Sequence, residues 1–445
     1  MHKILVHQYL VGGYFAVTFI CAIIFMLPVS TVDHSGLNFT DAIFLASSGI
    51  STTGLSTIDV GSQLTFFGQI VLMALFQIGG LGYMTYIIFI AYILGLKISY
   101  LTDTIAKESV SGSEYDSLKI FFFAVLTITF IFEVCGAAIL TASWQKQLGL
   151  KNAFYHGVFH SISTFCTAGF SLNSDSMMKF QNNTVINCTI IILSLIGGIG
   201  FFVIEDIRGY FKKILKKEYP RSISTHTKTV IIFTILIITY GSLVILLNEK
   251  WTDDISIYNR IIISIFQSVS ASTTDGFNSI DVSAMTQISL FMLIILMFVG
   301  AAPGSTGGGI KISTFAAIFR YSTGQLFGDS GRIFFFKRTI PAQTILKAFG
   351  IFFWFILIIV IDLMIMSITD KASFLEMFFE IISALGNAGL SMGITAKLSV
   401  AAKLVLALTM FIGRVGPIAF GFFIASRRTE NETTFKYAED DIFVG

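Results

Sequence analysis

Charged residues are scarce in this chain of 445 residues: Asp, Glu, Lys and Arg together make up only 13% of it. A typical soluble domain carries about 25% charged residues, so a water-soluble globular enzyme is nearly excluded. Proline is also rare, with five residues, whereas 54% of the chain is hydrophobic and 46 residues are Phe. Disordered chains are poor in aromatic residues, so disorder is excluded as well. The net charge of +2 gives no reason to expect nucleic acid or another polyanion as a partner.

Cysteine is equally sparse, with four residues at wide spacing. They lie in or beside apolar runs and match no disulfide framework or metal motif, so we expect small core residues. They are Cys21, Cys135, Cys166 and Cys188. The chain also lacks GxSxG and HExxH motifs and paired carboxylates placed for hydrolysis. The sequence therefore predicts no catalytic residue and no enzyme.

Long apolar stretches account for most of the chain. A bilayer core of about 30 Å is crossed by roughly 20 apolar residues in a helix, and eight stretches are long enough. They lie at approximately residues 8–29, 67–96, 118–142, 184–206, 229–247, 286–319, 345–368 and 402–426. Between the two members of each successive pair lies a semi-apolar segment that is too short to span. The sequence therefore predicts an all-α membrane protein with eight spanning helices.

Each short segment ends in small polar residues and a glycine, at intervals of roughly 110 residues. The four ends are STTGLS, CTAGFS, TTDGFN and GNAGLS, with Gly54, Gly169, Gly276 and Gly389. A second small-residue break follows about 25 residues later inside each long apolar run, in the order IGGLG, IGGIG, VGAAPG and IGRVG. Two motifs that recur four times in a fixed order indicate an internal fourfold repeat.

The repeat unit is a spanning helix (M1), a short re-entrant pore helix with its glycine loop (P), and a second spanning helix (M2). We predict four covalently linked M1–P–M2 repeats around a pseudo-fourfold central pore, with eight spanning helices plus four re-entrant pore helices. The predicted repeats are residues 1–96, 97–206, 207–320 and 321–428, followed by a cytoplasmic tail at 429–445.

The distribution of Lys and Arg predicts the orientation. Both termini and the links between repeats share one side, which carries 20 of the 29 basic residues, against 8 on the other side. Cytoplasmic loops are enriched in Lys and Arg, so we expect both termini in the cytoplasm and the pore loops entering from outside. The link at 207–228 is the most basic. It is either a topology determinant near anionic lipid or a docking segment for a cytosolic partner.

The four glycine loops have the composition of a cation filter. Irregular backbone at membrane depth is tolerated only where protein or water covers it, and loops that meet around an axis satisfy that condition. A cation filter needs a ring of backbone carbonyls. Glycine reaches the required positive φ without placing a Cβ in the lumen, and the carbonyl end of each pore helix favours a cation. Close helix packing is the alternative, and it explains the M2 glycines equally well.

The M2 stretch of the third repeat is interrupted most strongly. Its residues 300–309 are GAAPGSTGGG, and both Gly and Pro are unfavourable inside a helix. We expect a helix, a loop at membrane depth, and a second helix that starts near Lys311. A phosphate-binding loop would need Lys after the last glycine, but Ile310 follows Gly309. No nucleotide is therefore expected to bind this chain.

This repeat, with one glycine in each pore loop, resembles the Trk/Ktr/HKT superfamily of potassium transporters over essentially the whole chain. Within it, the chain resembles the membrane subunits of the bacterial Ktr systems. Gly54 in the first loop implies potassium, because some plant relatives with Ser there select sodium. The resemblance places the ion among the backbone carbonyls of the four loops. The predicted filter residues are Thr52, Thr53, Gly54, Thr167, Ala168, Gly169, Thr274, Asp275, Gly276, Asn387, Ala388 and Gly389.

The same resemblance makes the loop 300–311 an intramembrane gate under the filter. The predicted gate residues are Gly300, Ala301, Ala302, Pro303, Gly304, Ser305, Thr306, Gly307, Gly308 and Gly309, together with Arg414. A charge in the middle of a span costs at least about 2.5 kcal/mol, so Arg414 should face the interior. There it would form a barrier to cations or bind carbonyls of the gate loop. The alternative is a buried salt bridge with Glu133 or Asp362.

Asp275 departs from the small residue that usually precedes the third glycine in that superfamily. Its carboxylate either attracts cations at the outer mouth or is held by a neighbour behind the filter. The resemblance further implies a bacterial cytoplasmic membrane and a homodimer seated on a cytosolic ring of RCK subunits. That ring, rather than this chain, would bind ATP, ADP or NAD.

The function implied by the resemblance is potassium uptake, which depends on sodium in many members. The alternatives are a sodium-selective pore and a cation symporter. A symporter usually has two repeats rather than four, so the fourfold count argues against it.

Overall fold

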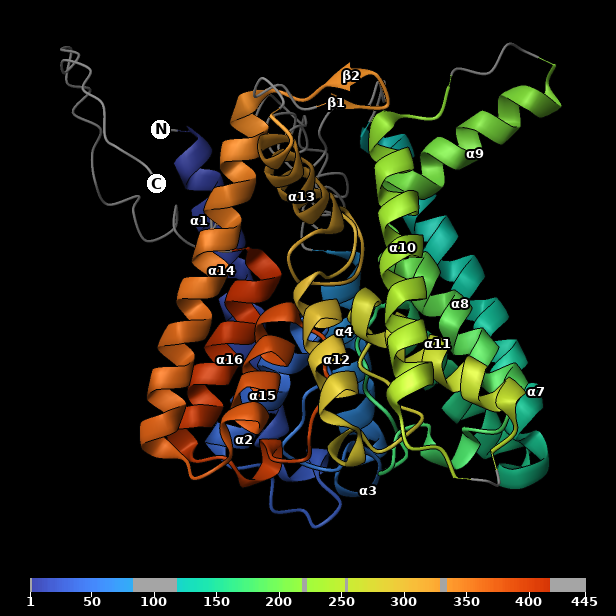
Figure 1. Cartoon of the computed structure of the whole chain (residues 1–445). Coiled ribbons are helices and arrows are strands. Elements are labelled where there is room, and N and C mark those ends of the chain that lie inside the picture. Colours follow the sequence, from blue (N-terminus) through green and yellow to red (C-terminus); the bar gives the residue numbers. More distant parts are fainter. Residues whose placement is uncertain (1, 83–117, 218–221, 253–254, 329–333, 417–445) are drawn as a thin grey trace.

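The computed structural model describes residues 2–82, 118–217, 222–252, 255–328 and 334–416, and within these ranges nearly all regular secondary structure is helical (Figure 1). The exception is an antiparallel hairpin of two short strands, β1 (Phe334–Phe335) and β2 (Arg338–Thr339). Phe336 and Lys337, the two residues between the strands, both have positive φ, as a tight two-residue hairpin turn requires. The all-α prediction missed this hairpin.

The helices follow the predicted order of spanning helix, pore helix and second spanning helix (Figure 1). Repeat 1 contains α1 (His2–Phe25), α2 (Phe39–Ile50), the short α3 (Val60–Gln63) and α4 (Phe66–Leu81); repeat 2 contains α7 (Leu118–Phe165), α8 (Thr184–Gly198) and α9 (Phe201–Leu215). Repeat 3 contains α10 (Thr225–Asn248), α11 (Ile257–Thr273), α12 (Gln287–Phe298) and α13 (Ile312–Leu326); repeat 4 contains α14 (Ala342–Thr369), α15 (Phe374–Gly386) and α16 (Val400–Val415). Single 3₁₀ turns lie at Pro28–Ser30, Met178–Phe180, Val282–Ala284 and Thr395–Lys397.

Three of the four pore helices begin at a polar cap. The side chains of Asn38, Ser256 and Ser373 accept a hydrogen bond from the backbone three residues on, and Glu376 completes a capping box with Ser373. The pore helix of repeat 2 has no such start, because α7 joins M1 and P across a kink at Gly149, where φ is 74° and ψ is 155°. A single glycine therefore reverses the chain at that point.

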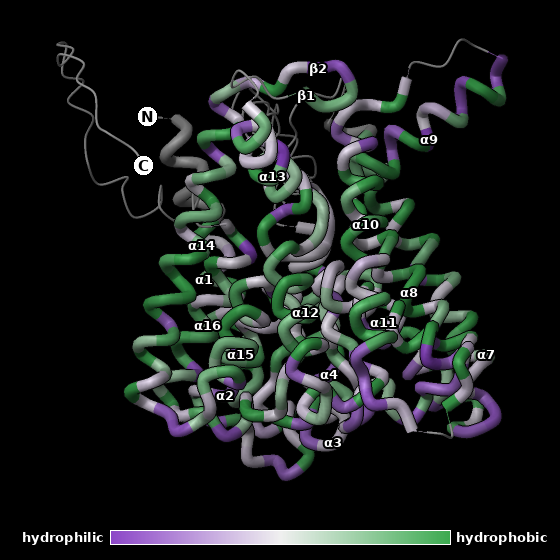
Figure 2. Tube along the Cα trace, in the orientation of Figure 1, coloured by the Kyte–Doolittle hydropathy of each residue, from purple (hydrophilic) through white to green (hydrophobic). Residues whose placement is uncertain are grey.

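The spanning and pore helices differ in what surrounds them. The M1 helices α10 and α14 have only 17% and 22% of their most apolar window buried, so most of their surface is left for lipid. In the pore helix α15, by contrast, every residue from Phe379 to Gly386 is buried. A half-length helix enclosed on all sides fits the predicted re-entrant position. Figure 2 shows that the bundle has a hydrophobic middle and more hydrophilic ends.

By length and composition, three described helices can each cross a bilayer: Phe121–Phe165, Thr225–Asn248 and Ala342–Thr369. The pair α8 and α9 would make a fourth, but the two helices meet at 94°. The predicted stretch 184–206 is therefore not one straight span. The helices α4, α12 and α16 are shorter, and the stretches 67–96 and 402–426 extend beyond the described residues.

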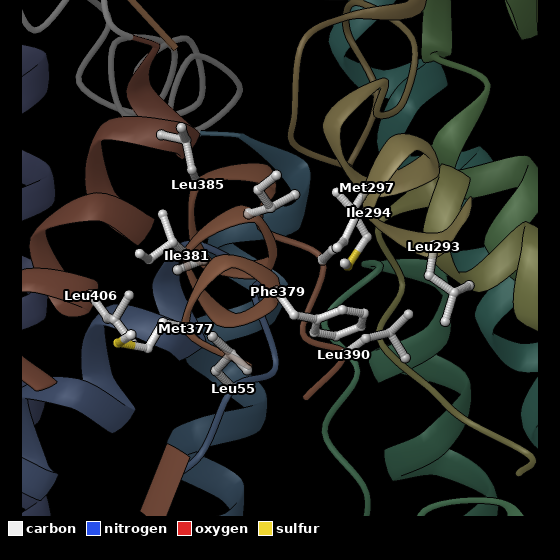
Figure 3. Close-up of a cluster of buried hydrophobic side chains, with 14 of the residues drawn as sticks. Leu55, Leu293, Ile294, Met297, Met377, Phe379, Ile381, Leu385, Leu390 and Leu406 are labelled. Atoms are coloured by element: carbon white, nitrogen blue, oxygen red, sulfur yellow. The ribbon is translucent and has the colours of Figure 1, made fainter. Parts of the chain in front are cut away.

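The largest buried cluster packs repeat 3 against repeat 4. Figure 3 shows Phe379 and Leu390 on the side of repeat 4 that faces Leu293 and Ile294 of α12. Leu55, which follows the first glycine loop, belongs to the same cluster. The core thus lies around the pore helices and fixes the position of their loops.

Candidate ion-conduction site

The four glycine loops meet in a closed ring. Each glycine lies against the backbone carbonyl of the residue that precedes the glycine of a neighbouring loop. A Cβ atom added to each glycine would lie very close to that carbonyl oxygen. The distances would be 2.5 Å from Gly54 to the Ala168 oxygen, 2.5 Å from Gly169 to the Asp275 oxygen, 2.8 Å from Gly276 to the Ala388 oxygen, and 2.0 Å from Gly389 to the Thr53 oxygen. Real Cβ atoms essentially never come within 3.0 Å of another atom. Only glycine therefore fits at the four positions.

The backbone of every loop passes twice through positive φ. The residue two positions before each glycine has φ between 49° and 59°, and the glycines have φ between 65° and 91°. The four preceding residues are Thr52, Thr167, Thr274 and Asn387. Positive φ is unusual for a β-branched residue and costs of order 1–3 kcal/mol. Three of the four residues are Thr, whereas Asn387 adopts this conformation more readily. Strain at three equivalent threonines means that the surrounding structure imposes it, as it commonly does at ligand sites.

The four glycines open onto one shared cavity of about 450 Å³. Hydroxyl and amide groups dominate its wall, among them Ser56, Ser171, Asn278 and Thr395. Asp59 is the one charged residue among the lining residues. A polar cavity thus lies directly against the four glycines.

Asp275 does not line this cavity, and its side chain is fully buried. Its Oδ2 accepts a hydrogen bond of 2.5 Å from Ser194 Oγ of α8. Its Oδ1 has no hydrogen-bond partner among the described residues. The carboxyl is thus held by a neighbouring helix, as one of the two interpretations expects, and it lies away from the cavity where the other interpretation places it.

Ser194→Ala should destabilise the folded chain, because it leaves the buried Asp275 carboxyl without its donor. A buried polar group that loses its partner costs about 1–3 kcal/mol. Thermal unfolding of the purified protein in one detergent should show a clear drop in the midpoint. Ser242→Ala is the matched control, because that part-buried hydroxyl bonds only to the Ile238 carbonyl of its own helix. Equal midpoints for the two variants would contradict this role of Ser194.

The loop between α12 and α13 lies against all four glycine loops. The sequence predicts a loop here, and α12 indeed ends at Phe298 while α13 begins at Ile312. Thr306 contacts two loops: its carbonyl accepts from Thr52 Oγ1 at 3.3 Å, and its hydroxyl lies 3.1 Å from Thr167 Oγ1. The third and fourth loops meet Gly308. Its N–H donates to Thr274 Oγ1 at 2.8 Å, and an added Cβ would lie 2.5 Å from the Gly386 carbonyl oxygen.

Two cationic side chains hold this loop. Arg414 donates to the carbonyls of Thr306 and Gly79. Lys311 donates to the Gly307 carbonyl at 2.6 Å and reaches the Gly308 carbonyl at 3.4 Å. The two basic groups thus lie beside the strained loops.

The predicted alternative for Arg414, a salt bridge with a buried acid, is wrong for the residues described. Asp362 instead accepts from Thr409 Oγ1 at 2.7 Å, and Glu133 lies 3.9 Å from Cys166 Sγ. The contacts of Lys311 with the loop carbonyls were not expected from the sequence. The available signal was a lysine two residues after a glycine run, inside an apolar stretch.

A sequence model of the cation transport protein TrkH matches residues 11–430 of this chain. The chain belongs to the TrkH family of cation transport proteins. Among its relatives, the "Ktr system potassium uptake protein B" of Vibrio alginolyticus is 37% identical over 95% of this chain and 91% of its own length. The protein of the same name from Bacillus subtilis (strain 168) is 34% identical over 98% and 96%.

The fold matches the crystal structure of the potassium transporter TrkH from Vibrio parahaemolyticus with a TM-score of 0.72. That likeness covers 93% of this chain and 83% of the other at 21% identity, so it shows the fold alone. Membership of the TrkH family confirms an all-α, polytopic membrane transporter rather than an enzyme. The predicted tail at 429–445 lies outside the described residues.

Proposed function

We propose that this chain conducts potassium into a bacterium across the cytoplasmic membrane, through the ring of four glycine loops. The observation that carries the proposal is the closed ring, in which each glycine meets the carbonyl of a neighbouring loop. Potassium is the proposed substrate because the named relatives are potassium uptake proteins and because Gly54 occupies the first position. An ion would leave its water in the polar cavity and exchange it for carbonyls of the loops, moving down its electrochemical gradient.

The loop at 300–311 is the proposed gate. Its hydrogen bonds to Thr52 and Thr274 place it directly against the filter loops. The Arg414 guanidinium beside it opposes a cation both by charge and by holding the loop in place. Opening therefore has to release the contacts of Thr306 and Gly308.

We further propose that the end of the bundle carrying α13 and the start of α1 faces the cytoplasm (Figure 1). The excess of Lys and Arg on that side supports this orientation. A homodimer seated on a cytosolic, nucleotide-binding RCK ring would supply the force that releases the gate. We also propose that potassium uptake by this chain depends on sodium as a co-ion.

Growth of a bacterium that lacks its own potassium uptake systems tests this function. The chain is expressed alone and then with a cytosolic RCK partner, at low external potassium. We expect rescue by the chain and stronger rescue with the partner. An empty vector is the control. No rescue in either case, with membrane expression confirmed, would favour a sodium-selective pore or a symporter.

A further inference from the structure

The helix α9 leaves its apolar face uncovered over its last turns. Phe211, Ile214 and Leu215 are 58%, 44% and 83% exposed, and the 3.6-residue period places them on one side of the helix. Basic residues occupy the other side and the end of the helix. These are Lys212, Lys213, Lys216 and Lys217. An amphipathic helix with lysines on its polar face is typical of segments that lie in a membrane interface.

The angle to the preceding helix fits such a position. α8 ends at Gly198, and α9 turns away from it by 94°. Gly200, with φ of 93°, makes the corner. A helix at right angles to a spanning segment lies along the membrane surface. Figure 1 shows α9 leaving the bundle at the end that carries α13.

Among the described residues, the four lysines at the end of α9 and just after it have no acidic partner, so they are available to an external anion. The two acidic residues of the helix are engaged near its start: Glu205 pairs with Arg208 at 2.7 Å, and Asp206 accepts from Ser224 N and Thr227 Oγ1. No carboxylate of the described ranges forms an ion pair with the four lysines. Their charge complements the phosphates of anionic lipid, where each basic residue strengthens binding about fivefold.

The first turn of α9 is part of the gate. The Phe201 N–H donates to the Gly304 carbonyl at 2.9 Å. The Phe202 ring packs on Gly304, since an added Cβ there would lie 2.6 Å from Phe202 Cε2. Val203 is fully buried in one cluster with Val299 and Ala302. Any tilt of α9 would therefore move the gate loop at Gly304.

We propose that α9 is an interfacial helix that binds anionic phospholipid, and that this binding holds the gate loop in its seated position. A ligand that favours the α9 pose of this structure also favours the loop contacts made in that pose. The effect of lipid on the gate loop rests on the proposed function, whereas the binding of lipid by α9 does not.

Lipid binding is tested on the purified full-length chain in detergent, by native mass spectrometry with phosphatidylglycerol and phosphatidylcholine of equal chain length. K212Q/K213Q/K216Q/K217Q should bind phosphatidylglycerol at least about tenfold more weakly than the unmodified chain. The matched control K146Q/K151Q/K179Q/K371Q removes four lysines from the other predicted side and should bind normally. Equal phosphatidylglycerol binding by all three proteins would overturn the proposal. Unchanged lipid binding with lost association to a cytosolic ring would assign the lysines to a protein partner and also overturn it.

Coupling to the gate is tested by cation flux in vesicles. With phosphatidylglycerol added to phosphatidylcholine, flux through the unmodified chain and the control should fall about fivefold. Flux through K212Q/K213Q/K216Q/K217Q should stay high in both kinds of vesicle. Flux that ignores lipid charge in the unmodified chain would overturn the gating half. Absence of flux from every protein in every vesicle would instead count against the proposed function and leave the lipid-binding result standing.

Discussion

Gly54→Ser should cut the discrimination of potassium over sodium by about tenfold or more, which corresponds to roughly 1.4 kcal/mol. A Cβ at this position would lie 2.5 Å from the Ala168 carbonyl oxygen and 3.1 Å from Gly169 Cα. Gly54 also has φ of 90°, which L-residues rarely adopt. The loop that contains Gly54 therefore has to shift, and the ring of carbonyls no longer fits potassium in preference to sodium. Competition of sodium with rubidium uptake in vesicles measures the change.

Gly149→Ser separates the effect of the ring from the general cost of positive φ. Gly149 has φ of 74°, but nothing lies within 4 Å of an added Cβ. It carries the same backbone constraint at the kink of α7, away from the four loops. Selectivity should survive in this control. Unchanged selectivity in Gly54→Ser, with normal folding of both variants, would count heavily against the filter assignment.

Deletion of residues 304–309 should raise cation flux at least about tenfold in the absence of any partner. The deletion removes Thr306 and Gly308, which make the contacts to the four filter loops. The base of the loop is already closed, because Val299 and Ile310, which the deletion leaves in place, form a bridge. A shorter connection can therefore join the same two helices.

Deletion of residues 334–339 is the matched control, since it removes six residues from the surface hairpin and none from the pore. Flux through that variant should remain at the level of the unmodified chain. A deletion of 304–309 that folds as a single species and still conducts no better would refute the gate assignment.

The sequence alone was sufficient to predict the order of the helices and the contact between the four glycine loops. Gly54, Gly169, Gly276 and Gly389 were predictable because close backbone approach and positive φ both require glycine. The loop between α12 and α13 was predictable because residues 300–309 cannot remain helical.

Other features depend on contacts between distant segments. Thr52 and Thr274 take up left-handed backbone against their own preference, because packing of the pore helices imposes it. Ser194 and Asp275 are 81 residues apart in the sequence, and no local sequence pattern predicts their hydrogen bond. The 94° corner between α8 and α9 arises where Gly200 lies against the loop between α12 and α13. A Cβ atom added to Gly200 would lie 2.7 Å from the Pro303 carbonyl oxygen. A glycine in an apolar run predicts a break but not its angle.

The central claim is that the ring of glycine loops binds potassium selectively, and equilibrium binding tests it without requiring an open gate. The purified chain is freed of potassium and titrated with potassium and then with sodium by calorimetry, alongside Gly54→Ser. The account predicts one saturable site that prefers potassium and that is weakened in Gly54→Ser. Potassium binding that is absent, no stronger than sodium binding, or unchanged in Gly54→Ser would contradict it.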